Sequence, residues 1–147
     1  MNTDNSISNV PALVLKHSSI TDAIIGAFYE VYNEMGQGFL ESVYREAMAC
    51  VLSAKGLAVE REKAVTVQFR GRTVGTFRTD LLVNSSVIVE LKCARALDSA
   101  HEAQLLNYLK ATQFEVGLLL NFGNRPQFRR MLLDNTHKKP QPSESYT

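Results

Sequence analysis

The segment Val87–Leu97, with the sequence VIVELKCARAL, is the feature that most constrains how this chain can fold. Apolar side chains occupy every second position of its first half, at Val87, Val89, Leu91 and Cys93. This alternation is typical of a β-strand with one face in a core. Glu90 and Lys92 lie on the other face, although charged side chains are rare on core strands unless they are paired. The segment therefore predicts a core strand that carries either a structural ion pair or a chemical site.

A hairpin is expected immediately before this strand. Residues 74–83 form a second strand-like run, and the polar residues 84–86 (Asn-Ser-Ser) predict a three-residue loop between the two strands. With a loop of that length, Asp80 lies opposite Glu90. Directly opposed residues point to the same face, and so do residues two apart on one strand. Asp80, Glu90 and Lys92 are therefore expected to converge on one face of the hairpin.

The three converging residue types indicate metal-assisted chemistry on a phosphate. Two adjacent carboxylates repel each other, so that one of them resists ionisation unless a cation lies between them. Magnesium is held by one or two carboxylates, keeps several waters and suits phosphate substrates. A neighbouring lysine can orient the attacking water or stabilise charge on a phosphoryl oxygen. A solvated ion pair between Glu90 and Lys92 remains the alternative.

The rest of the chain predicts an α/β or α+β fold, in which helices flank a mixed central β-sheet. Apolar residues at helical spacing predict helices at 20–35, 39–55 and 99–111. Ser19 or Thr21 is expected to cap the first helix, and Gly36 to end it. Period-two alternation predicts strands at 65–69, 74–83 and 87–93, and a buried strand at 115–121. Residues 128–133 are expected to form either a strand or a short helix, so the order is α-α-β-β-β-α-β followed by this element.

Composition indicates one domain in a reducing compartment. A chain of 147 residues, 45% of them hydrophobic, can bury one core. We expect a flexible arm at 1–18, a single domain at 19–134 and a disordered tail at 135–147. Neither a signal peptide nor a membrane span is recognisable, and two cysteines are too few for a disulfide framework, so a soluble, cytoplasmic protein is expected.

The spacing of Asp80 and the triplet Glu90-Leu91-Lys92 resembles the D…ExK signature of the PD-(D/E)XK nuclease superfamily. Thr79 stands where the name of the signature has proline. Before the hairpin, the segment GFLESVY at 38–44 matches the GxxExxY signature after which one family of that superfamily is named. After it, the segment HEAQLLNYLKAT at 101–112 resembles the following helix, with a QxxxY pattern. The resemblance extends over about 20–133.

The resemblance implies a restriction-endonuclease-like core and a Mg²⁺ or Mn²⁺ site. The implied metal ligands are Asp80, Glu90, the Leu91 carbonyl and, directly or through water, Glu41. Lys92 would position or activate the attacking water. Four further side chains would support the site or line its rim: Gln104, Tyr108, His101 and Tyr44.

Several of these residues also have a structural interpretation that the sequence leaves open. Glu41 lies in the first turn of a helix, where acidic residues favour the helix dipole. Tyr44 lies on an apolar stripe and His101 stands alone, so both are also consistent with packing. Cys50 and Cys93 are expected to be buried as apolar side chains. Eight basic residues either surround the site or form a charged surface: Arg61, Lys63, Arg70, Arg72, Arg78, Arg125, Arg129 and Arg130.

The functional expectation is a metal-dependent nuclease that hydrolyses phosphodiester bonds in nucleic acid, with DNA favoured, and without a membrane partner. A homodimer is a further expectation, because small nucleases of this type often pair to cut two strands. The alternative is a catalytically silent module with the nuclease fold, which binds nucleic acid or a protein partner.

Overall fold

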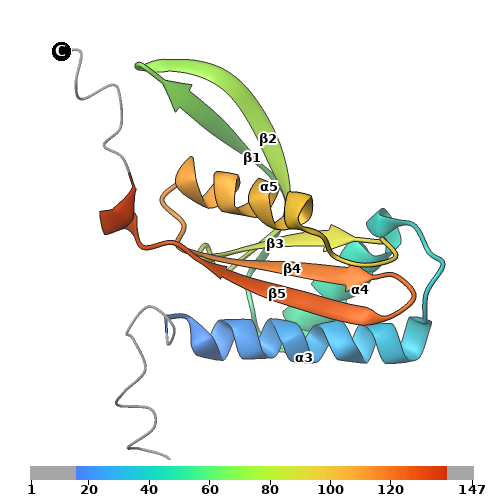
Figure 1. Cartoon of the computed structure of the whole chain (residues 1–147). Helices are drawn as coiled ribbons and strands as arrows, with labels where there is room; N and C mark the ends of the chain where they lie inside the picture. Colours follow the sequence, from blue (N-terminus) through green and yellow to red (C-terminus); the bar gives the residue numbers. More distant parts are fainter. Residues whose placement is uncertain (1–15, 139–147) are drawn as a thin grey trace, which may run out of the picture.

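The computed structural model describes residues 16–138, and these form a mixed five-stranded sheet with helices on both faces (Figure 1). The elements, in chain order, are α3 (Ser18–Met35), α4 (Glu41–Ala54), β1 (Val59–Phe69), β2 (Arg72–Val83), β3 (Val87–Lys92), α5 (Ser99–Lys110), β4 (Val116–Phe122) and β5 (Pro126–Leu132). The strand order is β1-β2-β3-β4-β5. β3 and β4 are parallel, and the other neighbours are antiparallel. The predicted α+β class and element order are confirmed, and the element left open after β4 is a strand.

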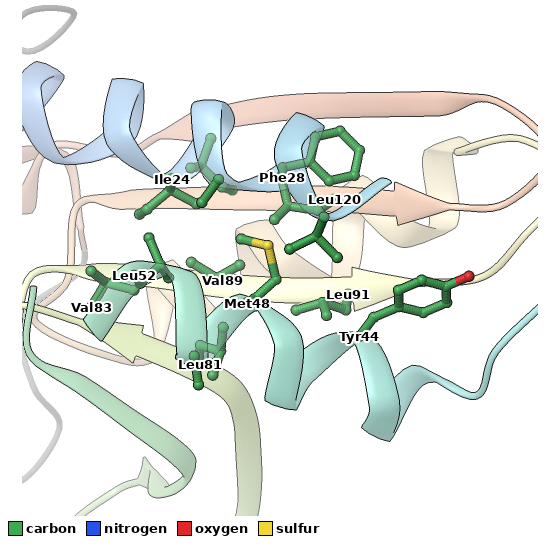
Figure 2. Close-up of a cluster of buried hydrophobic side chains, with 14 of the residues drawn as sticks. Ile24, Phe28, Tyr44, Met48, Leu52, Leu81, Val83, Val89, Leu91 and Leu120 are labelled. Atoms are coloured by element: carbon green, nitrogen blue, oxygen red, sulfur yellow. The ribbon is translucent and has the colours of Figure 1, made fainter. Parts of the chain in front are cut away.

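The larger core lies between the sheet and the helices α3 and α4. Apolar side chains of both helices face those of the central strands, as Figure 2 shows for Ile24, Phe28, Met48, Leu52, Val89 and Leu91. The apolar positions of these helices recur at helical spacing, so each helix turns one continuous stripe toward the sheet. This packing covers one face of β3 and holds the strand at the centre of the molecule.

A second, smaller core lies under α5, on the opposite face of the sheet. It contains Ile88 of β3 and Leu119 of β4, together with Leu105 and Leu109 of the helix. β3 is therefore buried on both faces, which is typical of a strand with a parallel neighbour and helices on each side. The face of β3 that carries Glu90 and Lys92 thus packs into the smaller hydrophobic core at Ile88 and is polar only at its other end.

The hairpin register expected from the sequence is confirmed over the paired residues. Val83 lies opposite Val87, Leu82 opposite Ile88 and Leu81 opposite Val89. The pairing ends there, because the next residue of β2 uses its side chain to bind the backbone of β3.

Several local predictions were wrong. The first helix begins at Ser18 after His17, without a side-chain cap, and the hydroxyl of Thr21 donates to the Ser18 carbonyl instead of capping the helix. The second helix begins at Glu41 rather than residue 39, because Gly38 has a φ of 111° and the backbone of Leu40, the N-cap residue, is extended. β1 begins six residues before the predicted strand, since its first residue, Val59, pairs with the buried end of β2.

Both cysteines are exposed, which contradicts their expected burial. Cys50 lies on the outer side of α4, and Cys93 follows the last residue of β3, where the strand has left the core.

Most of the expected arm and tail, at 1–15 and 139–147, lies outside the described residues, so the boundaries at 18 and 134 stay predictions. Asp134 caps a short 3₁₀ turn at Asn135–His137, beyond the expected end of the domain. In the described part of the chain, every helix is too short or too polar to cross a membrane.

Candidate functional site

Asp80 and Glu90 lie on neighbouring strands at the point where the ladder between β2 and β3 ends. Oδ2 of Asp80 accepts a hydrogen bond of 2.8 Å from the backbone N–H of Leu91. Glu90 is only 7% exposed, and its Oε1 is buried without a hydrogen-bond partner among the described residues. A buried carboxylate oxygen without a donor is costly, so this atom needs a proton or a cation.

The electrostatics of this pair are dominated by burial. Burial raises the pKa of Glu90 to about 9, and the neighbouring Asp80 contributes to the rise, whereas Lys92 opposes it. Without a cation, Glu90 therefore holds a proton at neutral pH. A divalent ion between the two carboxylates would displace that proton, because it favours the ionised form more strongly than a single lysine can.

Glu41 approaches the pair from the first turn of α4. Burial raises the pKa of its carboxyl and so does Asp80, whereas Lys92 and the backbone N–H of Cys93 lower it. Among residues 16–138, however, no three His, Cys, Asp or Glu side chains are grouped closely enough to hold an ion. The donor set that could hold a cation here is thus the pair Asp80 and Glu90, with Glu41 as a nearby charge. Magnesium accepts such a set because it keeps several waters.

α5 brings two of the expected rim residues to the site. Nζ of Lys92 donates a hydrogen bond of 3.3 Å to Oε1 of Gln104, which holds the ammonium group above the end of β3. Tyr108 lies one turn further along the same helix face. Burial raises the pKa of the Tyr108 hydroxyl, and the carboxylates of Glu90 and Asp80 add to this effect. The pKa of the Tyr108 hydroxyl therefore depends on the charge of both acids.

His101 and Tyr44 have structural contacts instead. Nδ1 of His101 accepts from the Asp98 N–H at 3.2 Å, and the His101 N–H donates to Asp98 Oδ1 at 3.0 Å. These two bonds form a capping box at the start of α5. Tyr44 is fully buried; its hydroxyl donates to the Gly36 carbonyl and accepts from the Phe39 N–H. It therefore anchors the loop that leads into Glu41.

A buried amide, which the sequence did not point to, holds the loop that follows Lys92. The side chain of Asn121 accepts from the Ala94 N–H and donates to the Ala94 carbonyl, both at 2.9 Å. A Cβ added at Gly123 would lie 1.8 Å from the same carbonyl oxygen. The signal that could have found this contact is a polar residue and a glycine at the end of the apolar run VGLLLN. A pocket of about 390 Å³ opens beside this loop, between segments 37–39, 93–95 and 122–124.

A comparison with protein families identifies the family of this chain. A model of the PD-(D/E)XK nuclease superfamily matches residues 18–131. The chain belongs to the PD-(D/E)XK nuclease superfamily. Its mixed sheet with flanking helices is the restriction-endonuclease-like fold of that superfamily. Nucleases of this superfamily generally use divalent metals such as Mg²⁺.

Two further comparisons are less informative. A search of the curated proteins found no match. Among solved structures, the chain is similar to the crystal structure of SSO0001, with a TM-score of 0.49 and 19% sequence identity. The similarity covers 82% of this chain and 61% of that one. This chain therefore spans about three fifths of that structure's length.

Proposed function

We propose that this member of the superfamily is a Mg²⁺- or Mn²⁺-dependent nuclease whose catalytic residues are Asp80, Glu90 and Lys92. The observation that carries the proposal is the buried, partnerless Oε1 of Glu90 beside Asp80, within the described part of the chain. A nuclease fold with a buried acid and a half-buried acid, where the ladder between two adjacent strands ends, has a use for a cation there. We further assign the chain to the GxxExxY family, on Gly38, Glu41 and Tyr44.

In this proposal each residue has a distinct role. Asp80, Glu90 and the Leu91 carbonyl would hold the cation, and Glu41 would complete the site directly or through water. When bound, the cation supplies positive charge beside the scissile phosphate and lowers the pKa of a bound water.

Lys92 orients the attacking water and stabilises the charge that develops on the phosphoryl oxygens. Gln104 keeps the ammonium group of Lys92 in place through their hydrogen bond. Tyr108 and Tyr44 support the site through packing, and His101 does so through the start of α5.

The test is cleavage of DNA and RNA by single variants. Asp80→Asn, Glu90→Gln and Lys92→Met should each lower the rate with Mg²⁺ or Mn²⁺ by about 10²–10³-fold, as removal of one group that stabilises transition-state charge does. Glu30→Gln, on α3, is the matched control and should cleave at the wild-type rate. Wild-type rates in all three site variants would contradict the proposal.

Calorimetric titration separates the nuclease from the alternative, a silent module that binds nucleic acid or protein. The nuclease should bind Mg²⁺ or Mn²⁺, and Glu90→Gln should abolish the signal. Failure of the wild-type chain to bind either ion would favour the silent module.

A cytoplasmic location fits two free, exposed thiols, and a homodimer would follow if both strands of a duplex are cut. Both belong to the proposal and are tested by fractionation and sedimentation.

A further inference from the structure

The β1–β2 hairpin extends well beyond the sheet, as an arm that passes α5 (Figure 1). We call residues 63–79 the ribbon. Its pairing runs from Lys63 opposite Thr79 to Phe69 opposite Arg72. At six steps of about 3.4 Å, the ribbon is about 20 Å long. Glu62, just before it, has a φ of 49°, and the pair formed by Glu62 and Asp80 is missing from the ladder. The ribbon therefore begins at a break directly beside the site.

The residues of the ribbon itself include basic side chains and no acidic ones. It contains four basic residues, Lys63, Arg70, Arg72 and Arg78, and no Asp or Glu. Arg70, Arg72 and Arg78 are exposed and form no ion pair with any carboxylate in residues 16–138. Some basic residues elsewhere form ion pairs, as Lys55 does with Glu30 and Arg129 with Glu102, whereas Arg95 and Arg125 form none within the described residues. Three of the four basic residues of the ribbon are thus without an acidic partner in the described part of the chain, and Lys63 pairs with Glu60 just before the ribbon. This positive charge is local, because the whole chain has a net charge of only +1.

The tip of the ribbon also exposes apolar side chains. Phe69 is 55% exposed and Val74 is 62% exposed, and the guanidinium of Arg70 lies 5.1 Å from the centre of the Phe69 ring. Apolar side chains flanked by arginines suit a nucleic acid, which offers sugar and thymine methyl groups between phosphates. Association of two copies through the tips would instead bring two cationic, acid-free ribbons together, and their repulsion opposes it.

The base of the ribbon is fixed relative to the site. The ring of Phe77 stacks on Tyr108 of α5, with centroids 3.7 Å apart and planes 6° apart. The same helix holds Lys92 through Gln104. From Asp80 to Arg72 at the tip is eight residues, which is at most about 27 Å of strand. A substrate phosphate at Asp80 and phosphates bound at the tip would therefore lie less than one helical turn of DNA apart.

We infer that the ribbon docks in the major groove of double-stranded DNA and makes duplex DNA the substrate of this site. The major groove, about 12 Å wide, admits a two-stranded β-ribbon, whereas the major groove of an RNA duplex is too deep and narrow. Arg70 and Arg72 contact phosphates that flank the groove. The inference rests on the proposed function, because it names the substrate of the proposed nuclease.

The test measures binding separately from cleavage. The full-length chain in EDTA is titrated against a fluorescein-labelled DNA duplex of about 24 base pairs, roughly two helical turns, and against a single strand and an RNA duplex of the same length. We expect tightest binding to the DNA duplex. Arg70→Asn/Arg72→Gln should weaken that binding and reduce the slope of log K against log salt by about 2, one for each phosphate that the variant no longer neutralises. Asn at position 70 tolerates the positive φ of this residue.

The control is Lys55→Ala/Arg129→Ala, which removes the same charge from the C-terminal end of α4 and from β5 and should leave the slope unchanged. Melting curves by circular dichroism verify that both double variants fold. A wild-type slope in the ribbon variant, or a preference for single strands or RNA, would overturn the inference. So would sedimentation showing a wild-type dimer that the ribbon variant cannot form. Weaker binding by the ribbon variant in EDTA, without any cleavage by the wild type, would support the ribbon and contradict the nuclease, so the two failures are distinguishable.

Discussion

At the scale of single residues, Glu90 has an unusual position for an acid. It lies on a strand that is buried on both faces, and one of its oxygens has no hydrogen-bond partner in the described part of the chain. The pKa of about 9 follows first from burial and then from Asp80. Such an arrangement destabilises a protein without a cation and becomes favourable when a cation is bound.

This arrangement predicts how stability depends on pH in the metal-free protein. The folded-state pKa of Glu90 lies above its unfolded value of 4.5, so between pH 4.5 and 9 the folded state binds the extra proton. The free energy of unfolding contributed by this group therefore falls as pH rises through that range. Glu90→Gln should remove this slope and raise the melting temperature at pH 8 by a few degrees.

Thermal melts in EDTA from pH 5 to 9 provide the measurement, and Glu60→Gln, an exposed acid on β1, is the control. An unchanged pH slope in Glu90→Gln would mean that Glu90 is ionised in the folded protein at neutral pH.

Gly123 gives a second prediction at the residue scale. Because an added Cβ would lie 1.8 Å from the Ala94 carbonyl oxygen, Gly123→Ala must displace the loop after Lys92. We expect the free energy of unfolding to fall by about 1–3 kcal/mol, as in other overpacked sites, and the cleavage rate to fall as well. Gly75→Ala is the matched control, since a Cβ there meets nothing within 4 Å. Urea titration of both variants compares them, and equal midpoints would contradict the expected clash.

At the scale of elements, α5 connects the site to the ribbon. It contributes Leu105 and Leu109 to the smaller core, Gln104 to Lys92 and Tyr108 to Phe77. The apolar and polar faces of this helix were partly predictable from its spacing, but its position over β3 depended on the parallel pairing of β3 with β4. The QxxxY pattern predicted that Gln104 and Tyr108 lie on one side of the helix, because residues i and i+4 share a helix face.

Two substitutions of Tyr108 should have different effects. Tyr108→Ala removes the stacking on Phe77 and should cost about 0.5–1.5 kcal/mol beyond the effect of reduced burial, with weaker binding of duplex DNA. Tyr108→Phe keeps the ring and should retain both stability and binding. Urea titration and fluorescence anisotropy provide the two measurements. Equal stability of the Ala and Phe variants would show that the stacking does not hold the ribbon.

At the scale of the whole molecule, the two cores place the polar site at one end of the buried strand. The apolar stripes of α3 and α4 cover one face of the sheet and α5 covers the other. β3 leaves the two hydrophobic cores near Lys92, its first residue that is only half-buried. There the segments 37–39, 93–95 and 122–124 meet around the pocket. The ribbon extends away from this body, because β1 and β2 are far longer than β3, the strand that follows them in the sheet.

The sequence by itself determined the structural features that involve residues close to one another along the chain. The alternation along residues 87–93 and the three-residue loop before it were enough to predict the hairpin register, which the structure confirms from Val83 opposite Val87 to Leu81 opposite Val89. The shared face of Asp80, Glu90 and Lys92 stays a prediction. Only the tertiary structure decided that Asp80 binds the Leu91 N–H, that Glu90 is buried and that Asn121 holds Ala94. These contacts join elements distant in sequence or depend on how helices cover the sheet. Tertiary packing also left the ribbon outside both hydrophobic cores, although Phe77 stacks on Tyr108 of α5. Periodicity along β1 and β2 could not indicate this, because the alternation is the same whether or not a helix covers the strands.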